Sequence, residues 1–128
     1  MKKQVFIIDD DPISIMILKK NLELVEVAQK ITTFSNGKDA LNHLKKEYKT
    51  EENYTIFLDI NMPEMNGWEF LNEIKSFVTP QNTTIYLLTS SINKLDKEKA
   101  TKFPIINQYL SKPICKEILK NIKEENKL

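Results

Sequence analysis

Short apolar runs alternate with segments of helical period along the whole chain, and this alternation limits the possible folds more than any other feature. The runs are rich in Ile, Val, Phe, Tyr and Thr, which are the residue types that favour strands. They predict five strands, over residues 4–8, 28–33, 55–58, 83–88 and 106–110. Three of the runs are almost continuously apolar, as expected of strands that are covered on both faces.

The segments between these runs carry apolar residues at the spacing of an α-helix. The four clearest stripes are Ile13, Ile17, Leu18 and Leu22; Ala40, Leu41 and Leu44; Trp68, Leu71, Ile74 and Val78; and Ile114, Ile118, Leu119 and Ile122. Residues 91–103 have fewer apolar positions, but a helix is expected there as well. Pro12 and Pro113 suit the first turn of a helix, and Ser35 or Asn36 suits an N-cap.

Strand–helix alternation of this kind is typical of α/β proteins. Parallel strands joined by right-handed helical crossovers form a (βα)5 unit with helices on both faces of the sheet. We therefore predict a doubly wound parallel sheet of five strands in the order 2-1-3-4-5, a flavodoxin-like architecture. Residues 1–128 would form one domain of ordinary size.

Composition excludes several classes of function. The net charge is +1 and lysines are mixed with glutamates, so the electrostatic attraction needed for non-specific nucleic-acid binding is missing. No apolar run approaches about 20 residues, so no membrane span is expected, and the apolar stretch near the N-terminus is too short for a signal peptide. Cys115 is the only cysteine, which precludes an intramolecular disulfide and favours a reducing, cytoplasmic location.

Polar residues that suit phosphoryl chemistry follow four of the predicted strands. The acidic run 9–11 follows the first strand, Asp59 the third, Thr89 the fourth and Lys112 the fifth. In an open parallel sheet the carboxyl ends of all strands lie at one edge, where ligands bind. The predicted strand order reverses between the first and third strands, so their aspartates should share one crevice.

Carboxylates that lie a few ångströms apart in a partly dry cleft raise one another's pKa or require a counter-ion. Mg²⁺ meets that need with one or two carboxylates, waters and a phosphate oxygen. Asp10 and Asp59 are the expected direct ligands, with Asp9 acting through water and a carbonyl of the loop after Asp59 completing the set. The alternative is that residues 9–11 are only a solvated strand end before a helix N-terminus, where acids are favourable.

At the end of its strand, Asp59 would be an exposed nucleophile that could form an aspartyl-phosphate. Phosphoryl transfer needs mainly positioning and charge neutralisation from the protein. The metal and Lys112 would supply positive charge, and the Thr89 hydroxyl would donate a hydrogen bond. Taken alone, Lys112 could be a surface lysine and Thr89 an ordinary strand residue; their joint placement argues for the site.

Four separated motifs resemble the receiver domain of two-component response regulators. They are residues 7–12 (Ile-Ile-Asp-Asp-Asp-Pro), 57–67 (Phe-Leu-Asp-Ile-Asn-Met-Pro-Glu-Met-Asn-Gly), 88–90 (Leu-Thr-Ser) and 109–113 (Tyr-Leu-Ser-Lys-Pro). The resemblance covers the whole chain in order and at the usual spacings, and the single-domain chemotaxis regulator of this family has the same strand order. Departures are Asn66, where acidic residues are common, and residues 103–107, where a Gly-Ala pair is more usual.

The resemblance implies a role for each motif residue. Asp59 would accept a phosphoryl group from a sensor histidine kinase or a histidine phosphotransfer protein, and the backbone carbonyl of Asn61 would join the Mg²⁺ ligands. Thr89 and Tyr109 would form the switch pair, and Asn61 and Ser91 would tune the lifetime of the phosphoryl group. Phosphorylation would then alter the surface of the fourth helix, fifth strand and fifth helix, which a downstream protein target reads. With no output domain expected, the protein would catalyse only its own phosphorylation and dephosphorylation.

Two other functions fit parts of the pattern. A phosphatase of the haloacid-dehalogenase type also uses a nucleophilic Asp, Mg²⁺, Thr or Ser, and Lys. That chemistry needs a second acid two residues after the nucleophile, and Asn61 stands there. A flavodoxin-like nucleotide module would need a phosphate loop after the first strand, where the acidic run 9–11 would instead repel phosphate. A receiver used unphosphorylated as an interaction module is a third possibility.

Overall fold

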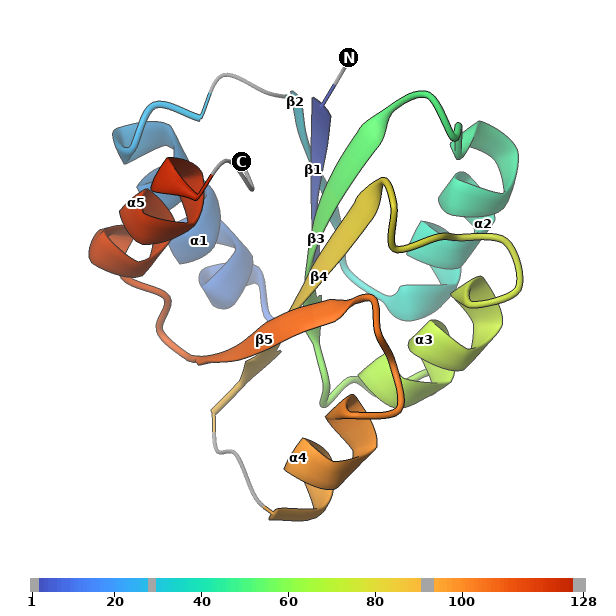
Figure 1. The fold of residues 1–128 in the computed structure, drawn as a ribbon. Coiled ribbons are helices and arrows are strands. Elements are labelled where there is room, and N and C mark those ends of the chain that lie inside the picture. Colours follow the sequence, from blue (N-terminus) through green and yellow to red (C-terminus); the bar gives the residue numbers. More distant parts are fainter. Residues whose placement is uncertain (1–2, 28–29, 91–93, 126–128) are drawn as a thin grey trace.

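The computed structural model describes residues 3–27, 30–90 and 94–125 (Figure 1). Within these residues five strands alternate with five helices, as the apolar pattern predicts. Their bounds are β1 Lys3–Ile8, α1 Pro12–Leu24, β2 Lys30–Phe34, α2 Gly37–Glu47, β3 Asn53–Asp59, α3 Gly67–Ile74, β4 Thr83–Thr89, α4 Lys94–Ala100, β5 Ile106–Ser111 and α5 Lys116–Glu124. No helix in these three stretches is long and apolar enough to cross a bilayer.

The strands form one sheet in the order β2-β1-β3-β4-β5, and all the pairings are parallel. This confirms the predicted topology. The register sets Ile8 at the end of β1 beside Leu58 of β3, and Asp59 beside Leu88 of β4. The residues that follow β1 and end β3 therefore emerge side by side at the carboxyl edge.

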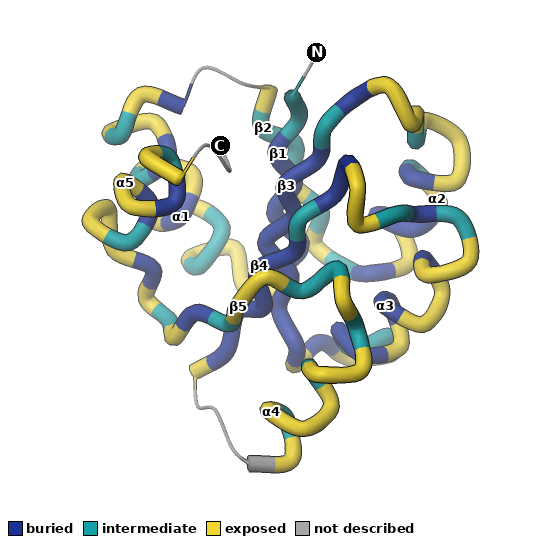
Figure 2. The backbone as a smooth tube through the Cα atoms, in the orientation of Figure 1, coloured by how far each residue is buried: buried dark blue, intermediate teal, exposed yellow. Residues whose placement is uncertain are grey.

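Helices cover both faces of the sheet, with α1 and α5 on one side and α2 and α3 on the other (Figure 1). Successive residues of a strand point to opposite faces. Ile56 and Leu58 accordingly pack with α2 and α3, whereas Phe57 packs with α1 and α5. Figure 2 shows the resulting dark core of β1, β3 and β4 between exposed outer helix faces. This burial on both sides explains why the central strands read as continuous apolar runs.

Side-chain caps define where three helices begin. Asp11 is the N-cap of α1, and Pro12 occupies the first turn as predicted. Asn36 caps α2, which decides between the two predicted candidates. Asn66 caps α3 in a capping box, in which its side chain accepts from the backbone of Glu69 and the Glu69 side chain accepts in return.

Two sequence predictions about helix positions are wrong. Pro113 does not open a helix, because α5 begins only at Lys116 and Pro113 follows a cis peptide bond in the preceding loop. In the first stripe Leu18 and Leu22 are buried, but Ile13 is 62% and Ile17 is 38% exposed. The reason is that apolar residues run almost continuously through the first turns of α1, so spacing alone does not select the buried face.

The bounds of two other elements differ from those predicted from the sequence. β2 runs from Lys30 to Phe34 rather than over 28–33; Phe34 joins the ladder beside Ile8, and residues 28–29 lie outside the described part. The helix expected over 91–103 is α4, Lys94–Ala100, and Ser91 also lies outside the described residues. Trp68 is buried and stacks on Phe103, which lies beyond α4.

Candidate functional site

Three aspartates meet where β1 and β3 end. Asp9, Asp10 and Asp59 each offer a carboxylate oxygen to a cluster whose atoms lie within 4.8 Å of one another. Asp9 and Asp59 are 1% and 4% exposed, whereas Asp10 faces solvent. The pairing of β1 with β3 at the switch point of the sheet produces this cluster, as the sequence predicts.

Asp11, the next acid in the run, has a different role. Its backbone N–H donates to Oδ1 of Asp9 at 2.9 Å, and its carboxylate accepts from the backbone of Ile13 at 3.0 Å and from the Ser14 hydroxyl at 3.1 Å. The hydrogen bond from Ile13 and that from Ser14 lower the pKa of Asp11. Asp11 therefore caps α1, and it also holds Asp9 in place.

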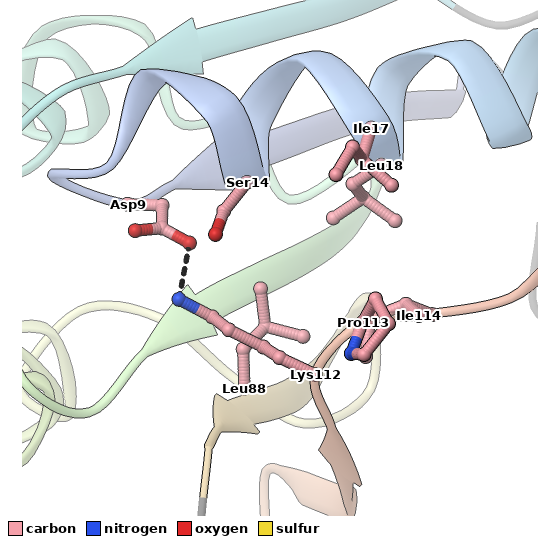
Figure 3. A pocket seen from close by; sticks show the side chains of 8 residues that line it. All are labelled: Asp9, Ser14, Ile17, Leu18, Leu88, Lys112, Pro113 and Ile114. Atoms are coloured by element: carbon pink, nitrogen blue, oxygen red, sulfur yellow. Dashed lines mark ion pairs between the residues drawn. The ribbon is translucent and has the colours of Figure 1, made fainter.

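Lys112 brings a positive charge into the cluster from the end of β5. Its Nζ atom lies 2.7 Å from Oδ2 of Asp9 and 3.6 Å from Oδ1 of Asp59. The side chain reaches across the end of the sheet toward Asp9 (Figure 3). Its backbone N–H donates to the carbonyl of Thr89 at 2.8 Å, which ties the loop after β5 to the end of β4.

The pKa of the Asp59 carboxylate lies well above its ordinary value. Burial and the nearby charge of Asp9 raise its pKa to about 7, while Lys112 and the backbone N–H of Asn61 act in the opposite direction. Burial lowers the pKa of Lys112, but the hydrogen bonds and charges of Asp9 and Asp59 outweigh this and raise it overall. Among the described residues, the three aspartates outnumber the one lysine that pairs with them, so the site keeps an excess of negative charge.

The other predicted site residues lie on the loop after β3 and on the strands β4 and β5. Asn61 is exposed, and its backbone N–H donates to Oδ1 of Asp59 at 3.2 Å. Thr89 is buried at the end of β4, one position beyond the residue that pairs with Asp59. Tyr109 of β5 is half-buried, packs against the cluster of core residues under α2 and α3, and borders a hollow beside α4.

A cavity of about 220 Å³ opens beside the ion pair of Asp9 and Lys112. Figure 3 shows that its walls come from α1, the end of β4 and the loop before α5. The lining residues are Asp9, Ser14, Ile17, Leu18, Leu88, Lys112, Pro113 and Ile114. Sequence reasoning missed Ser14, although its place three residues after an N-cap Asp is a signal that could have indicated it.

The aspartate cluster suits a hard divalent cation. Its donors are all carboxylate oxygens, one of them on an exposed residue, as Mg²⁺ prefers when it keeps part of its water shell. Oδ2 of Asp9 is buried, and the Lys112 ammonium 2.7 Å away compensates its charge. The cluster could therefore hold Mg²⁺.

Comparison with known proteins identifies the fold family. The model of the response regulator receiver domain matches residues 5–123. Over 118 residues the chain is 27% identical to the sensor histidine kinase CheAY of Helicobacter pylori, covering 92% of this chain but only 14% of that protein.

Solved structures of a response regulator and of a receiver domain also superpose on this chain. A two-component response regulator from Cytophaga hutchinsonii superposes with a TM-score of 0.85 at 29% identity, covering 98% of this chain and 97% of that one. The receiver domain of the sensor histidine kinase PA1611 from Pseudomonas aeruginosa, with magnesium coordinated in its active-site cleft, superposes with a TM-score of 0.76 at 19% identity over 98% of this chain and 97% of that one. The chain therefore belongs to the response regulator receiver family, the phosphoacceptors of two-component signalling.

Proposed function

We propose that Asp59 is the phosphoacceptor and that it takes a phosphoryl group from a phosphohistidine on a sensor histidine kinase or a histidine phosphotransfer protein. One observation carries this choice. Among the three clustered aspartates, Asp59 is the one that ends a central strand, and its Oδ1 lies 3.6 Å from the Lys112 ammonium. Asp9 is already engaged by Lys112 and by the Asp11 N–H.

Magnesium is the proposed cofactor. Asp10 and Asp59 would bind it directly with the backbone carbonyl of Asn61, and Asp9 would act through water. The bound ion would supply positive charge to the phosphoryl oxygens and offset the repulsion between carboxylates. The cluster geometry supports this proposal, as does the magnesium in the cleft of the Pseudomonas receiver domain.

In the transfer step, a carboxylate oxygen of Asp59 attacks the phosphorus of the phosphohistidine. The new O–P bond forms as the P–N bond breaks, and the imidazole leaves with the electron pair and takes up a proton from solvent. Lys112 neutralises the phosphoryl oxygens, and the Thr89 hydroxyl donates a hydrogen bond to one of them. Hydrolysis of the acyl phosphate then restores the carboxylate.

The switch pair would carry the signal away from Asp59. Thr89 would move toward the phosphoryl group and Tyr109 would turn inward, which would change the surface of α4, β5 and α5. The hollow beside Tyr109, bordered by Lys97 and Ala100 of α4, gives the ring a space that such a movement would alter. A downstream protein target would bind the changed surface, which requires only a few kcal/mol of differential affinity.

Some expectations from the sequence stay predictions. The chain spans 14% of the length of CheAY, so that protein's kinase activity is not carried over. The restriction of catalysis to the protein's own phosphorylation and a cytoplasmic location are predictions from the sequence pattern.

The acceptor is tested by intact mass spectrometry after treatment with acetyl phosphate and Mg²⁺. The wild-type protein should gain one phosphoryl mass, and Asp59→Asn should gain none. Asp11→Asn is a matched control, because this neighbouring acid caps α1 and Asn is an equally good cap. It should label like the wild-type protein.

Metal dependence is tested in the same assay. Excess chelator should abolish labelling of the wild-type protein, because uncompensated carboxylates repel an incoming phosphate. Equal labelling of wild type and Asp59→Asn would place the acceptor elsewhere. Full labelling in the presence of chelator would refute the magnesium proposal.

A further inference from the structure

The chain has two glycines, Gly37 and Gly67, and both have the same position relative to a helix and its N-cap. Each is the first residue of a helix and follows an N-cap Asn, whose side chain accepts from the backbone of the third helical residue. The two cap distances are 2.8 and 2.9 Å. Neither glycine has a positive φ angle, so neither is required for its backbone conformation.

The surroundings of the two glycines differ sharply. A Cβ atom on Gly37 would lie 3.2 Å from Sδ of Met65, the far part of a flexible side chain. A Cβ atom on Gly67 would lie 2.8 Å from the carbonyl oxygen of Asp59 and 2.9 Å from Cα of Ile60. These atoms are backbone, and the chain can relieve the overlap only by moving the strand end or the helix.

The peptide that Gly67 contacts has little freedom to move. The N–H of Ile60 donates to the carbonyl of Leu88 in β4 at 3.1 Å, and the N–H of Gly67 donates to the carbonyl of Ile60 at 2.8 Å. Ile60 itself is buried. The residue after the proposed acceptor is therefore held between β4 and the first turn of α3, and a methyl group on Gly67 would push directly on Asp59.

We propose that Gly67 is a positioning residue for phosphoryl transfer: its bare Cα lets α3 seat against the Asp59–Ile60 peptide and keeps the Asp59 carboxylate beside Asp10 and Lys112. This inference rests on the proposed role of Asp59 as acceptor. A displacement of about 1 Å at a reacting group costs on the order of a hundredfold in rate, so a smaller shift should still be measurable.

The test compares Gly67→Ala with Gly37→Ala. Both substitutions put the same methyl group at the first position of a helix behind an Asn cap, so their effects on helix propensity should match. Labelling by acetyl phosphate with Mg²⁺ is followed at several donor concentrations, and thermal unfolding is measured in parallel. Gly37→Ala should label like the wild type. Gly67→Ala should label roughly tenfold more slowly or worse at saturating donor, with little change in the half-saturating concentration.

Asn66→Ala separates positioning from simple loss of stability. It removes the cap of α3 but leaves the contact between Gly67 and Asp59 intact, so it should lower the unfolding temperature without slowing labelling. Gly67→Ala that labels at the wild-type rate would overturn the proposal, as would Asn66→Ala that labels as slowly as Gly67→Ala.

The remaining outcomes are also decisive. If Gly67→Ala does not fold even in the cold with a stabilising osmolyte, Gly67 is a requirement of the fold and the positioning role is wrong. If the wild-type protein itself fails to label, the proposed function fails, which is a different result from slow labelling of one variant.

Discussion

The ammonium of Lys112 lies 2.7 Å from Oδ2 of Asp9 and joins the end of β5 to the end of β1. The carboxylate is almost completely buried, with 1% of its side chain exposed, whereas 19% of the lysine is exposed. Removing one partner of such a pair leaves a buried charge without compensation. The lysine is therefore the group on which the electrostatic balance of the site depends.

Substituting Lys112 with Ala should separate metal binding from phosphoryl transfer. The three aspartates remain, so Mg²⁺ affinity measured by calorimetry should not fall below that of the wild type. Labelling by acetyl phosphate should slow by about tenfold or more, because one positive group near the phosphoryl oxygens is lost. Lys116→Ala, an exposed lysine at the start of α5, is the control. Weaker Mg²⁺ binding by Lys112→Ala would contradict this division of roles.

The metal-free protein should become less stable as the pH rises toward neutral. The pKa of Asp59 is about 7 in the folded protein against an ordinary value of 3.8, so the folded state binds more protons between these values. Stability is therefore highest below about pH 4 as far as this group is concerned, and it is lost as the pH rises through about 7. Urea unfolding with chelator should show a loss on the order of 1 kcal/mol after screening by solvent.

Two comparisons make that pH prediction specific. Asp59→Asn carries no titrating group at this position, so most of the pH dependence in the window should disappear. Adding Mg²⁺ to the wild type at neutral pH should restore stability by binding the folded state alone. A wild-type protein whose metal-free stability is flat between these pH values would contradict the raised pKa of Asp59.

Tyr86→Phe should stabilise the protein. The Tyr86 ring is fully buried against Phe57, and its hydroxyl has no hydrogen-bond partner among the described residues. Burial and then the charge of Glu125 raise the pKa of Tyr86 to about 12, so the hydroxyl stays protonated. Removing a buried unpaired hydroxyl should raise the unfolding free energy by about 1 kcal/mol, measured by urea denaturation.

Tyr54→Phe is the matched control for that substitution. The Tyr54 hydroxyl is also buried, but it accepts from the backbone of Lys49 at 2.9 Å. Its loss should destabilise the protein by about 1 kcal/mol. If Tyr86→Phe destabilises the protein as Tyr54→Phe does, the assignment of Tyr86 as unpaired is wrong.

Glu26→Gly should also stabilise the protein. Glu26 follows Val25, the C-cap of α1, and has a φ of 60°. The N–H of Val27 donates back to the carbonyl of Leu22 at 3.1 Å, a geometry that usually has Gly in place of Glu26. Relief of the left-handed strain should raise the unfolding free energy by about 0.5–1 kcal/mol. Glu23→Gly, inside the last turn of α1, should instead lower it by about 1 kcal/mol. A lower melting temperature for Glu26→Gly would refute the prediction.

Much of the fold could be predicted from the sequence, because strands that are buried on both faces of the sheet have almost only apolar residues. The strands that pack on both sides, such as β3 and β4, are continuous apolar runs, and the polar residues that follow them mark the carboxyl edge. That edge is enough to bring Asp9, Asp10 and Asp59 together, since parallel strands align their ends. The aspartate cluster and the approach of Lys112 were therefore predictable.

Packing between helices and strands determined the features that the sequence pattern did not predict. The buried face of α1 was settled by packing against α5 and the sheet, because Ile13 and Ile17 are as apolar as the residues that are buried. Two glycines in matching Asn-Gly pairs look alike in the sequence, yet only Gly67 lies against the backbone of Asp59. The sequence pattern indicates which side chains are buried. It does not indicate which neighbouring atoms surround each residue, because those contacts form only when the helices and strands pack together.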